Sequence, residues 1–175
     1  MKIIVPIGIS GSGKSTFYNE YFKDYKLICP DQIRLQLTGD ISNQTKNGEV
    51  FNIANQMIMD CLKNNEDFYY DATNVNTKYR KDFTKKVKGI NPDAKVVYVY
   101  FPSDIELSSD RITLDLANNV VRSNVPKAVL ERQNKLYMES LQSSWLEEGA
   151  DNAFVIDTTS AQNNYIDELT EILNS

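Results

Sequence analysis

The sequence predicts an α/β protein in which five parallel strands form one sheet flanked by helices. Short apolar runs rich in Val, Ile, Tyr and Phe alternate along the chain with longer segments of helical spacing. A glycine-rich turn at residues 8–13 follows the first apolar run and leads directly into a helical segment. Strands that alternate with helices form βαβ units, and these units place the strands parallel in one sheet.

The strands are predicted from apolar runs that end at turn residues. The first run is apolar almost throughout, as expected of a central parallel strand that is buried on both faces. Pro30 ends the second run because proline cannot donate to a strand ladder. The predicted strands are residues 2–7, 26–29, 67–71, 95–101 and 153–156.

The helices are predicted from apolar spacing and from residues that favour helix starts. The apolar stripe between Phe51 and Leu62 has helical spacing and predicts the longest helix of the first half. Pro126 is expected at the first position of a helix, where its missing N–H costs nothing. The side chains expected to cap helix N-termini are those of Asp31, Thr77 and Ser103. The other predicted helices span residues 14–23, 31–37, 77–88, 105–116 and 164–173.

The composition is that of one ordinary globular domain, which we expect to span residues 1–175. Hydrophobic residues make up 41% of the chain and charged residues 25%. The formal net charge of −5 argues against non-specific binding to long duplex nucleic acid. Because the chain has no histidine, any acid–base chemistry must use Asp, Glu, Lys or Tyr.

The cysteines and the apolar runs predict where the protein works. Cys29 and Cys61 are isolated and predict no disulfide framework, which fits a reducing compartment. The first apolar run is too short for a signal peptide, and no stretch approaches transmembrane length. We therefore expect a cytoplasmic protein without a membrane partner, either cellular or phage-encoded and acting in the host cytoplasm.

The segment Gly8 to Ser15 fits G-x-x-x-x-G-K-[ST], the Walker A phosphate-binding loop. Its glycines let backbone N–H groups point at phosphate oxygens, and the helix that follows adds its dipole. Lys14 would reach the β- and γ-phosphates, and the Ser15 hydroxyl would bind Mg²⁺. A glycine-rich turn without a ligand is the alternative, but every fixed position is present between a strand and a helix. The residues expected to bind ATP are Gly8, Ser10, Gly11, Ser12, Gly13, Lys14, Ser15 and Thr16.

Asp31 and Arg34 follow the second predicted strand and lie one helical turn apart. The carboxyl end of that strand lies at the same sheet edge as the phosphate loop. A carboxylate there can orient or accept the proton of an attacking hydroxyl, and an arginine can hold an anionic group. The alternative is an N-cap aspartate next to a surface arginine.

The turn Asp71-Ala72-Thr73-Asn74 follows the third predicted strand. A carboxylate at this position can hold Mg²⁺ directly or through water, or it can simply cap the turn. Thr73 and Asn74 offer a hydroxyl and an amide to a substrate, or they satisfy the backbone of the turn itself.

A basic helix and two separated arginines complete the set of candidate groups. The helix after the D-A-T-N turn carries five lysines and Arg80, which we expect on its outward side, opposite an apolar side at Tyr79, Phe83 and Val87. This side either is simply solvated or guides an anionic substrate. Arg111 and Arg122 flank a polar segment, residues 112–125, where small P-loop kinases carry a lid, although either arginine could be a surface residue. Residues 157–159 could line a base pocket.

These motifs together resemble the polynucleotide 5′-hydroxyl kinase family, the kinase modules of bacteriophage and bacterial end-healing enzymes among the AAA-like small P-loop kinases. The resemblance runs from Ile3 to about Leu141. It implies ATP and Mg²⁺ as cofactors and a DNA or RNA 5′-hydroxyl end as acceptor. It also implies Lys14, Asp31 as general base, Arg34, and the lid arginines Arg111 and Arg122 as the catalytic set. By the same resemblance, the acceptor is bound by Arg34, Asp71, Thr73, Asn74 and Arg80, and the metal by Ser15 and Asp71.

The lid departs from the family pattern. The lid arginines of the family are usually closely spaced, whereas those of this chain, at positions 111 and 122, lie eleven positions apart. Three functions therefore stay open at this point. The first is a polynucleotide kinase, the second is a kinase of a small-molecule hydroxyl (a nucleoside, sugar or antibiotic), which the acidic charge favours, and the third is an NTP-binding module without transfer chemistry. No phosphatase motif follows the kinase region.

Overall fold

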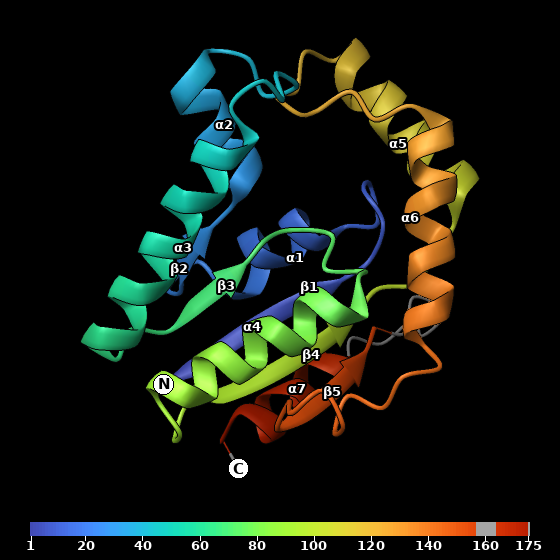
Figure 1. Ribbon diagram of the computed structural model, residues 1–175. Helices are drawn as coiled ribbons and strands as arrows, with labels where there is room; N and C mark the ends of the chain where they lie inside the picture. The colour runs from blue at the N-terminus through green and yellow to red at the C-terminus, as the bar shows by residue number, and fades with distance from the viewer. Residues whose placement is uncertain (157–163, 175) are drawn as a thin grey trace.

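A five-stranded parallel sheet forms the centre of the computed structural model, which describes residues 1–156 and 164–174 (Figure 1). The strand order is β2-β3-β1-β4-β5, so β1 lies in the middle of the sheet. The strands are β1 (Lys2–Ile7), β2 (Lys26–Ile28), β3 (Phe68–Tyr70), β4 (Lys95–Tyr100) and β5 (Asn152–Val155). The predicted α/β fold with a five-stranded parallel sheet is therefore confirmed.

Helices cover both faces of this sheet (Figure 1). They are α1 (Lys14–Tyr21), α2 (Pro30–Thr38), α3 (Asn47–Asn64), α4 (Thr77–Ile90), α5 (Ile105–Ala117), α6 (Lys127–Ser140) and α7 (Asn164–Asn174). Within the described ranges, none of them has both the length and the apolar character needed to cross a bilayer.

The two faces of the sheet bury separate clusters because neighbouring residues of a strand point to opposite sides. Ile3 of β1 is fully buried in a cluster that includes Val87 of α4 and the apolar side of α3. Ile4 points the other way and joins Phe17 of α1 and Leu169 of α7. Burial on both faces explains why β1 and β4 are apolar along most of their length.

Pro6 lies inside the central strand, where proline normally removes a ladder hydrogen bond. β1 pairs with β4 along its whole length, from Lys2 opposite Lys95 to Ile7 opposite Tyr100. On the other side β1 pairs with β3 only at Ile3 and Ile4. The Pro6 carbonyl faces this second side, where it accepts a hydrogen bond from Asn74 Nδ2 at 2.8 Å. Because the N–H and C=O of a strand residue point the same way, the missing Pro6 N–H falls beyond the β3 ladder.

Two helices are capped by a residue next to the predicted cap, because a better acceptor stands there. Asn76, rather than Thr77, caps α4 with its side chain. Asp104, rather than Ser103, caps α5. The Ser103 hydroxyl instead bonds Asn134 Oδ1 of α6 at 2.7 Å. Asn and Asp match or exceed Thr and Ser as N-caps, which agrees with both differences.

The starts of α2 and α6 also differ from prediction. Cys29 occupies the N-cap position of α2, and Asp31 lies inside the first turn without capping it. Its carboxylate is therefore available for other contacts. Pro126 is the N-cap residue of α6 rather than its first helical residue.

Candidate active site

The phosphate loop, residues 8–15, joins the end of β1 to the start of α1 at the centre of the sheet edge (Figure 1). Gly11 and Gly13 have φ angles of 79° and 104°, which L-residues with a side chain rarely adopt. A Cβ on Gly11 would also lie 2.8 Å from the Ser108 carbonyl oxygen of α5. The loop therefore depends on glycine both for its conformation and for its contact with α5.

Lys14 is buried in the loop with only 7% of its surface exposed. Its ammonium group donates to the carbonyls of Gly8 at 3.0 Å and Ile9 at 2.7 Å. Burial lowers the pKa of Lys14 to about 8; Asp71 and Asp31 act against this, and Arg122 adds to it. A phosphate oxygen beside the ammonium would favour its charged form.

Ser15 and Asp71 meet across the sheet edge, since the Ser15 hydroxyl donates to Asp71 Oδ2 at 2.7 Å. Asp71 follows β3 directly, and its backbone N–H donates to the Ile28 carbonyl at 2.9 Å. Burial raises the pKa of Asp71, while Lys14 and the Ser15 hydroxyl oppose the rise. A hydroxyl and a carboxylate beside a phosphate loop are the hard oxygen donors that Mg²⁺ prefers. The donor set therefore fits the metal that the sequence predicts here.

Thr16, Ser10 and Ser12 complete the expected nucleotide-binding set. Thr16 is exposed in the first turn of α1, where its hydroxyl can reach a ligand. The Ser12 hydroxyl lies 3.4 Å from Lys14 Nζ. The Ser10 N–H donates to Gln133 Oε1 at 2.8 Å, which ties the loop to α6.

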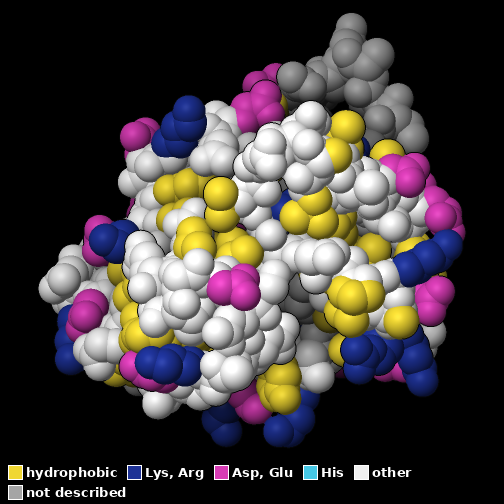
Figure 2. Space-filling view, turned by 90° about the horizontal axis from the view of Figure 1, so that it is seen from above, with side chains coloured by type: hydrophobic (Ala, Val, Ile, Leu, Met, Phe, Trp, Pro, Cys, Tyr) yellow, Lys and Arg dark blue, Asp and Glu magenta, His cyan; other side chains and the backbone are white. Residues whose placement is uncertain are grey.

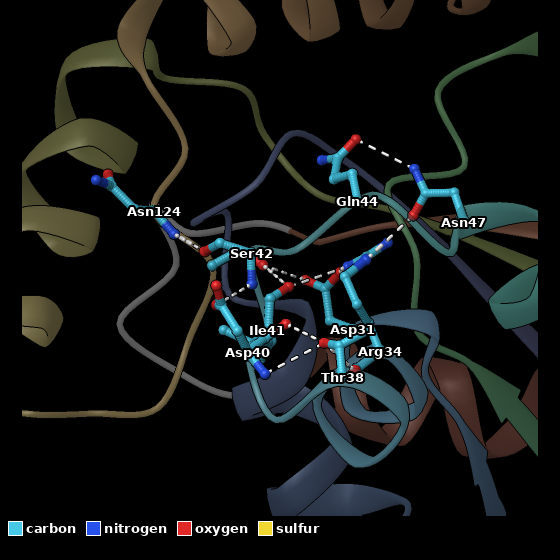
Figure 3. A network of polar contacts seen from close by, with 10 residues as sticks. Asp31, Arg34, Thr38, Asp40, Ile41, Ser42, Gln44, Asn47 and Asn124 are labelled. Carbon is cyan, nitrogen blue, oxygen red and sulfur yellow. Dashed lines mark hydrogen bonds and ion pairs between the residues drawn. The ribbon is translucent and has the colours of Figure 1, made fainter.

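Asp31 and Arg34 form an ion pair on α2 beside this centre (Figure 3). Arg34 is buried, with 6% of its surface exposed, so the alternative of a surface arginine is wrong. It also donates to Asn47 Oδ1 at 3.2 Å and to the Ile41 carbonyl at 3.3 Å. These contacts fix the arginine between α2, the α2–α3 loop and the start of α3.

The predicted lid meets the α2–α3 loop above the phosphate loop (Figures 1 and 3). The Ser123 hydroxyl lies 3.1 Å from Asp31 Oδ2 and 3.2 Å from the Ile41 carbonyl oxygen. The Asn124 N–H donates to the Ser42 hydroxyl at 3.3 Å. Asp31 thus has Arg34 on one oxygen and Ser123 near the other, and the two walls of the site touch.

The face on which these walls meet carries its charged side chains chiefly around the rim, and its centre is mostly uncharged (Figure 2). Among the described residues, this face shows no broad basic surface of the kind that binds a nucleic-acid duplex.

Both lid arginines reach the neighbourhood of the phosphate loop. Arg111 is exposed and donates to the Gly11 carbonyl at 3.3 Å. Arg122 pairs with Asp115 Oδ2 at 2.5 Å, and its buried Nε has no partner among the described residues. Arg122 is close enough to Lys14 to help lower the pKa of that lysine. The eleven-residue separation in sequence therefore does not keep the two arginines from the same loop.

The sequence matches a known family over most of its length. Residues 3–140 match the model of the family described as AAA domain. The chain belongs to this family. No curated protein matches the sequence.

Solved structures, two of them kinases, share the fold of this AAA-domain chain. A chain of the Pnkp1/Rnl/Hen1 RNA repair complex aligns with a TM-score of 0.67 and 20% identity over 81% of this chain and 45% of that one. This chain thus spans less than half of that neighbour. Deoxyadenosine kinase from M. mycoides aligns with a TM-score of 0.58 and 19% identity over 100% of both chains. Shikimate kinase from Acinetobacter baumannii aligns with a TM-score of 0.55 and 17% identity over 98% of this chain and 93% of that one. The P-loop kinase fold is therefore shown, and it hosts several acceptor classes.

The D-A-T-N turn is held by hydrogen bonds to the phosphate loop and to strands β1 and β3. The Thr73 carbonyl accepts a hydrogen bond from the Gly8 N–H at 3.0 Å. Asn74 has a φ of 51°, and its amide contacts the carbonyls of Pro6 at 2.8 Å, Tyr70 at 3.1 Å and Ala72 at 3.2 Å. For Asn74, the structure therefore agrees with the alternative that its side chain satisfies the turn.

Arg80 does not lie on the outward side of α4, and this prediction is wrong. Only 2% of Arg80 is exposed, whereas Tyr79, predicted on the apolar side, is 70% exposed. The buried stripe of α4 runs through Arg80, Thr84 and Val87. The guanidinium can be buried because Glu148 neutralises it, with contacts of 2.7 and 2.8 Å. Arg80 consequently has no direct access to a substrate.

Sequence reasoning missed three residues that shape the site, namely Ser123, Gln133 and Glu148. Each contacts a partner at least 68 positions away, so no local pattern marks it. Residues 157–159, expected near a base pocket, lie outside the described residues.

Proposed function

We propose that this chain is an ATP-dependent kinase that transfers a phosphoryl group to the 5′-hydroxyl end of a nucleic acid. The observation that carries the proposal is the Asp31–Arg34 pair, which stands beside Lys14 closely enough for Asp31 to affect the lysine's pKa. A carboxylate paired with a buried arginine, next to a phosphate loop, suits a hydroxyl acceptor that carries a nearby anionic group.

The phosphate loop supplies the donor half of the site. Its N–H groups and Lys14 bind the ATP phosphates, and Ser15 and Asp71 hold Mg²⁺. The metal, when bound, neutralises charge on the phosphate oxygens. Arg111 and Arg122 add positive charge from the lid side, which helps to neutralise the charge on the transferring phosphoryl group.

The acceptor half uses Asp31 as the general base. Asp31 takes the proton of the acceptor hydroxyl while the oxygen of that hydroxyl forms a bond to the γ-phosphorus of ATP. The bond between this phosphorus and the bridging oxygen breaks, and ADP leaves with that oxygen. Arg34 holds the first phosphate of the acceptor. The Ser123 hydroxyl lies near Asp31 Oδ2, the oxygen that the acceptor hydroxyl would approach, so the two hydroxyls compete for it.

A kinase of a small-molecule hydroxyl is the second candidate. The contact of Ser123 and Asn124 with the α2–α3 loop encloses the acceptor side, which favours a small acceptor. The structural neighbours support both candidates, since one belongs to an RNA repair complex and others are shikimate and deoxyadenosine kinases.

A transfer assay with matched acceptors separates the candidates. Wild-type protein with ATP and Mg²⁺ is offered 5′-hydroxyl DNA and RNA oligonucleotides, a 3′-mononucleotide, a nucleoside and shikimate. We expect labelling of the oligonucleotides, at a KM that rises with salt. Labelling of the nucleoside or shikimate alone would replace the first candidate with the second, and ATP binding without any transfer would refute both.

A further inference from the structure

Arg80 and Glu148 form a buried ion pair behind the D-A-T-N turn. The side chains of both residues are 1% exposed. The guanidinium donates from Nε and one terminal nitrogen to the two carboxylate oxygens, at 2.8 and 2.7 Å. It also lies over the ring of Tyr98, 5.5 Å from the ring centre. Such a pair is costly to desolvate and is by itself weak grounds for stability, so its purpose needs another explanation.

The remaining donors of Arg80 point at the turn. Nη1 donates to the Asn74 carbonyl at 2.8 Å, and Nη2 reaches the Thr77 hydroxyl at 3.3 Å. Asn74 is in the left-handed region, which costs an asparagine less than other residues but still needs support from its surroundings. Arg80 provides that support by donating to the Asn74 carbonyl.

The D-A-T-N turn contacts both ends of the phosphate loop, at Gly8 and at Ser15. The Asn74 amide joins it to β1 and β3 through the carbonyls of Pro6 and Tyr70. The Thr73 carbonyl holds the Gly8 N–H at the start of the phosphate loop. Asp71, three residues before Asn74, holds the Ser15 hydroxyl. A displaced Asn74 would therefore move the expected metal-binding carboxylate relative to the loop.

We infer that Arg80 and Glu148 are positioning residues that lock the turn at residues 71–74, keeping Asp71 against Ser15 and Thr73 against Gly8. Glu148 lies beyond α6, and its negative charge balances the positive charge of the buried Arg80 guanidinium. Arg80 can therefore reach the buried carbonyl of Asn74. The inference rests on the proposed phosphotransferase activity for its kinetic readout and on ATP binding for its second readout.

The test replaces the pair rather than breaking it. Removing one partner would bury an unpaired charge, whereas Arg80→Met with Glu148→Leu keeps the volume apolar and is expected to leave thermal stability close to wild type. We expect kcat to fall about 10²-fold, because displacement of a site by about 1 Å costs this much. The KM for the acceptor stays near wild type, and ATP binding needs more Mg²⁺ for half-saturation.

Lys88→Met is the matched control. Lys88 also lies on α4 and also pairs with the segment beyond α6, at 2.7 Å from Asp151. Within the described part of the chain its ammonium contacts Asp151 and the Ala94 carbonyl, and neither belongs to the turn. The Lys88 variant should leave kcat and the Mg²⁺ requirement unchanged. A folded double variant with wild-type kcat and Mg²⁺ requirement would overturn the inference.

Arg80→Lys covers the case in which the double variant does not fold. Lysine keeps a positive charge for Glu148 but lacks the planar fork that also reaches the Asn74 carbonyl, so the same fall in kcat and the same Mg²⁺ requirement are expected. Wild-type kcat and Mg²⁺ requirement in this folded variant would equally overturn the inference. If the wild type transfers to no acceptor, the proposed function fails, and Mg²⁺-dependent ATP binding still tests the lock.

Discussion

The proposed donor and acceptor halves of the site are built in different ways. The donor half is one continuous stretch, Gly8 to Ser15, supported by a carboxylate from the neighbouring strand. The acceptor half is assembled by side chains, as when Ser123 reaches Asp31 across 92 positions of sequence. Backbone geometry therefore defines the first half, and tertiary contacts define the second. The halves should respond differently to substitution.

The largest expected effects come from replacing Asp31 and Asp71, and they should differ between the two aspartates. Asp31→Asn should lower transfer by about 10² to 10⁴-fold, the usual contribution of a general base, while Mg²⁺-dependent ATP binding stays intact. Asp71→Asn should weaken both, because Asp71 contacts Ser15 in the donor half. Rapid-quench transfer and calorimetric ATP titration measure the two quantities. Undiminished transfer by the Asp31 variant would remove it as the base.

Gly11→Ala should damage the donor half alone. Its φ of 79° and the 2.8 Å approach of a Cβ to the Ser108 carbonyl both oppose a side chain. A strain of about 1–2 kcal/mol lowers ATP affinity about 10-fold or more. Gly48→Ala in α3 is the control, since no atom lies within 4 Å of the added carbon. Equal ATP affinity of the two variants would contradict the prediction.

The pKa of Lys14 predicts a pH dependence of the donor half. With its pKa lowered to about 8 by burial, Lys14 is charged at pH 7 and loses its proton above pH 8. Because phosphate favours the charged form, ATP binding at pH 8.5 should take up a proton, and affinity should fall by up to about 10-fold per pH unit above 8. Calorimetry in buffers of different ionisation enthalpy measures the uptake, and Lys14→Arg should abolish it.

The same shift affects the ligand-free protein in the opposite sense. Between pH 8 and 10 the unfolded chain keeps the Lys14 proton that the folded chain has released, so this group makes the free energy of unfolding rise with pH. Lys14→Met should remove that rise in denaturant titrations. A slope that persists in the variant would assign the dependence to another group.

Ser123→Ala should have the smallest effect and should improve the use of the acceptor. Its hydroxyl contacts Asp31 Oδ2 at 3.1 Å, where an acceptor hydroxyl would otherwise bond. Removing this competitor should raise kcat/KM for the acceptor about 3-fold and leave ATP affinity unchanged. A fall in kcat/KM would show instead that the contact helps to assemble the site.

Sequence reasoning reached the fold and the donor half because both depend on local signals. Alternating apolar runs predicted the order of strands and helices along the chain, and one motif located the loop whose glycines have positive φ. Asp31 and Asp71 were found because the carboxyl ends of parallel strands converge on one edge of the sheet.

The remaining contacts could not be predicted because the role of these residues depends on partners that are distant in sequence. Arg80 belongs to a run of basic residues that would normally be solvated, yet its distant partner draws it inside. Asp31 resembles a helix cap, but Cys29 occupies that position and leaves the carboxylate for Arg34. No spacing within the sequence contains the information that Ser123 or Glu148 lies beside these groups.

The place of Glu148 also decides where this chain can be shortened. The family match ends at residue 140, eight positions before Glu148. A fragment cut at that boundary would retain every residue proposed to contact a substrate, and it would lack the counter-ion of a guanidinium that is 1% exposed. A buried charge without its partner typically costs 3–5 kcal/mol, roughly a third or more of a small domain's stability. During synthesis, too, Arg80 lacks this counter-ion until Glu148 has left the ribosome.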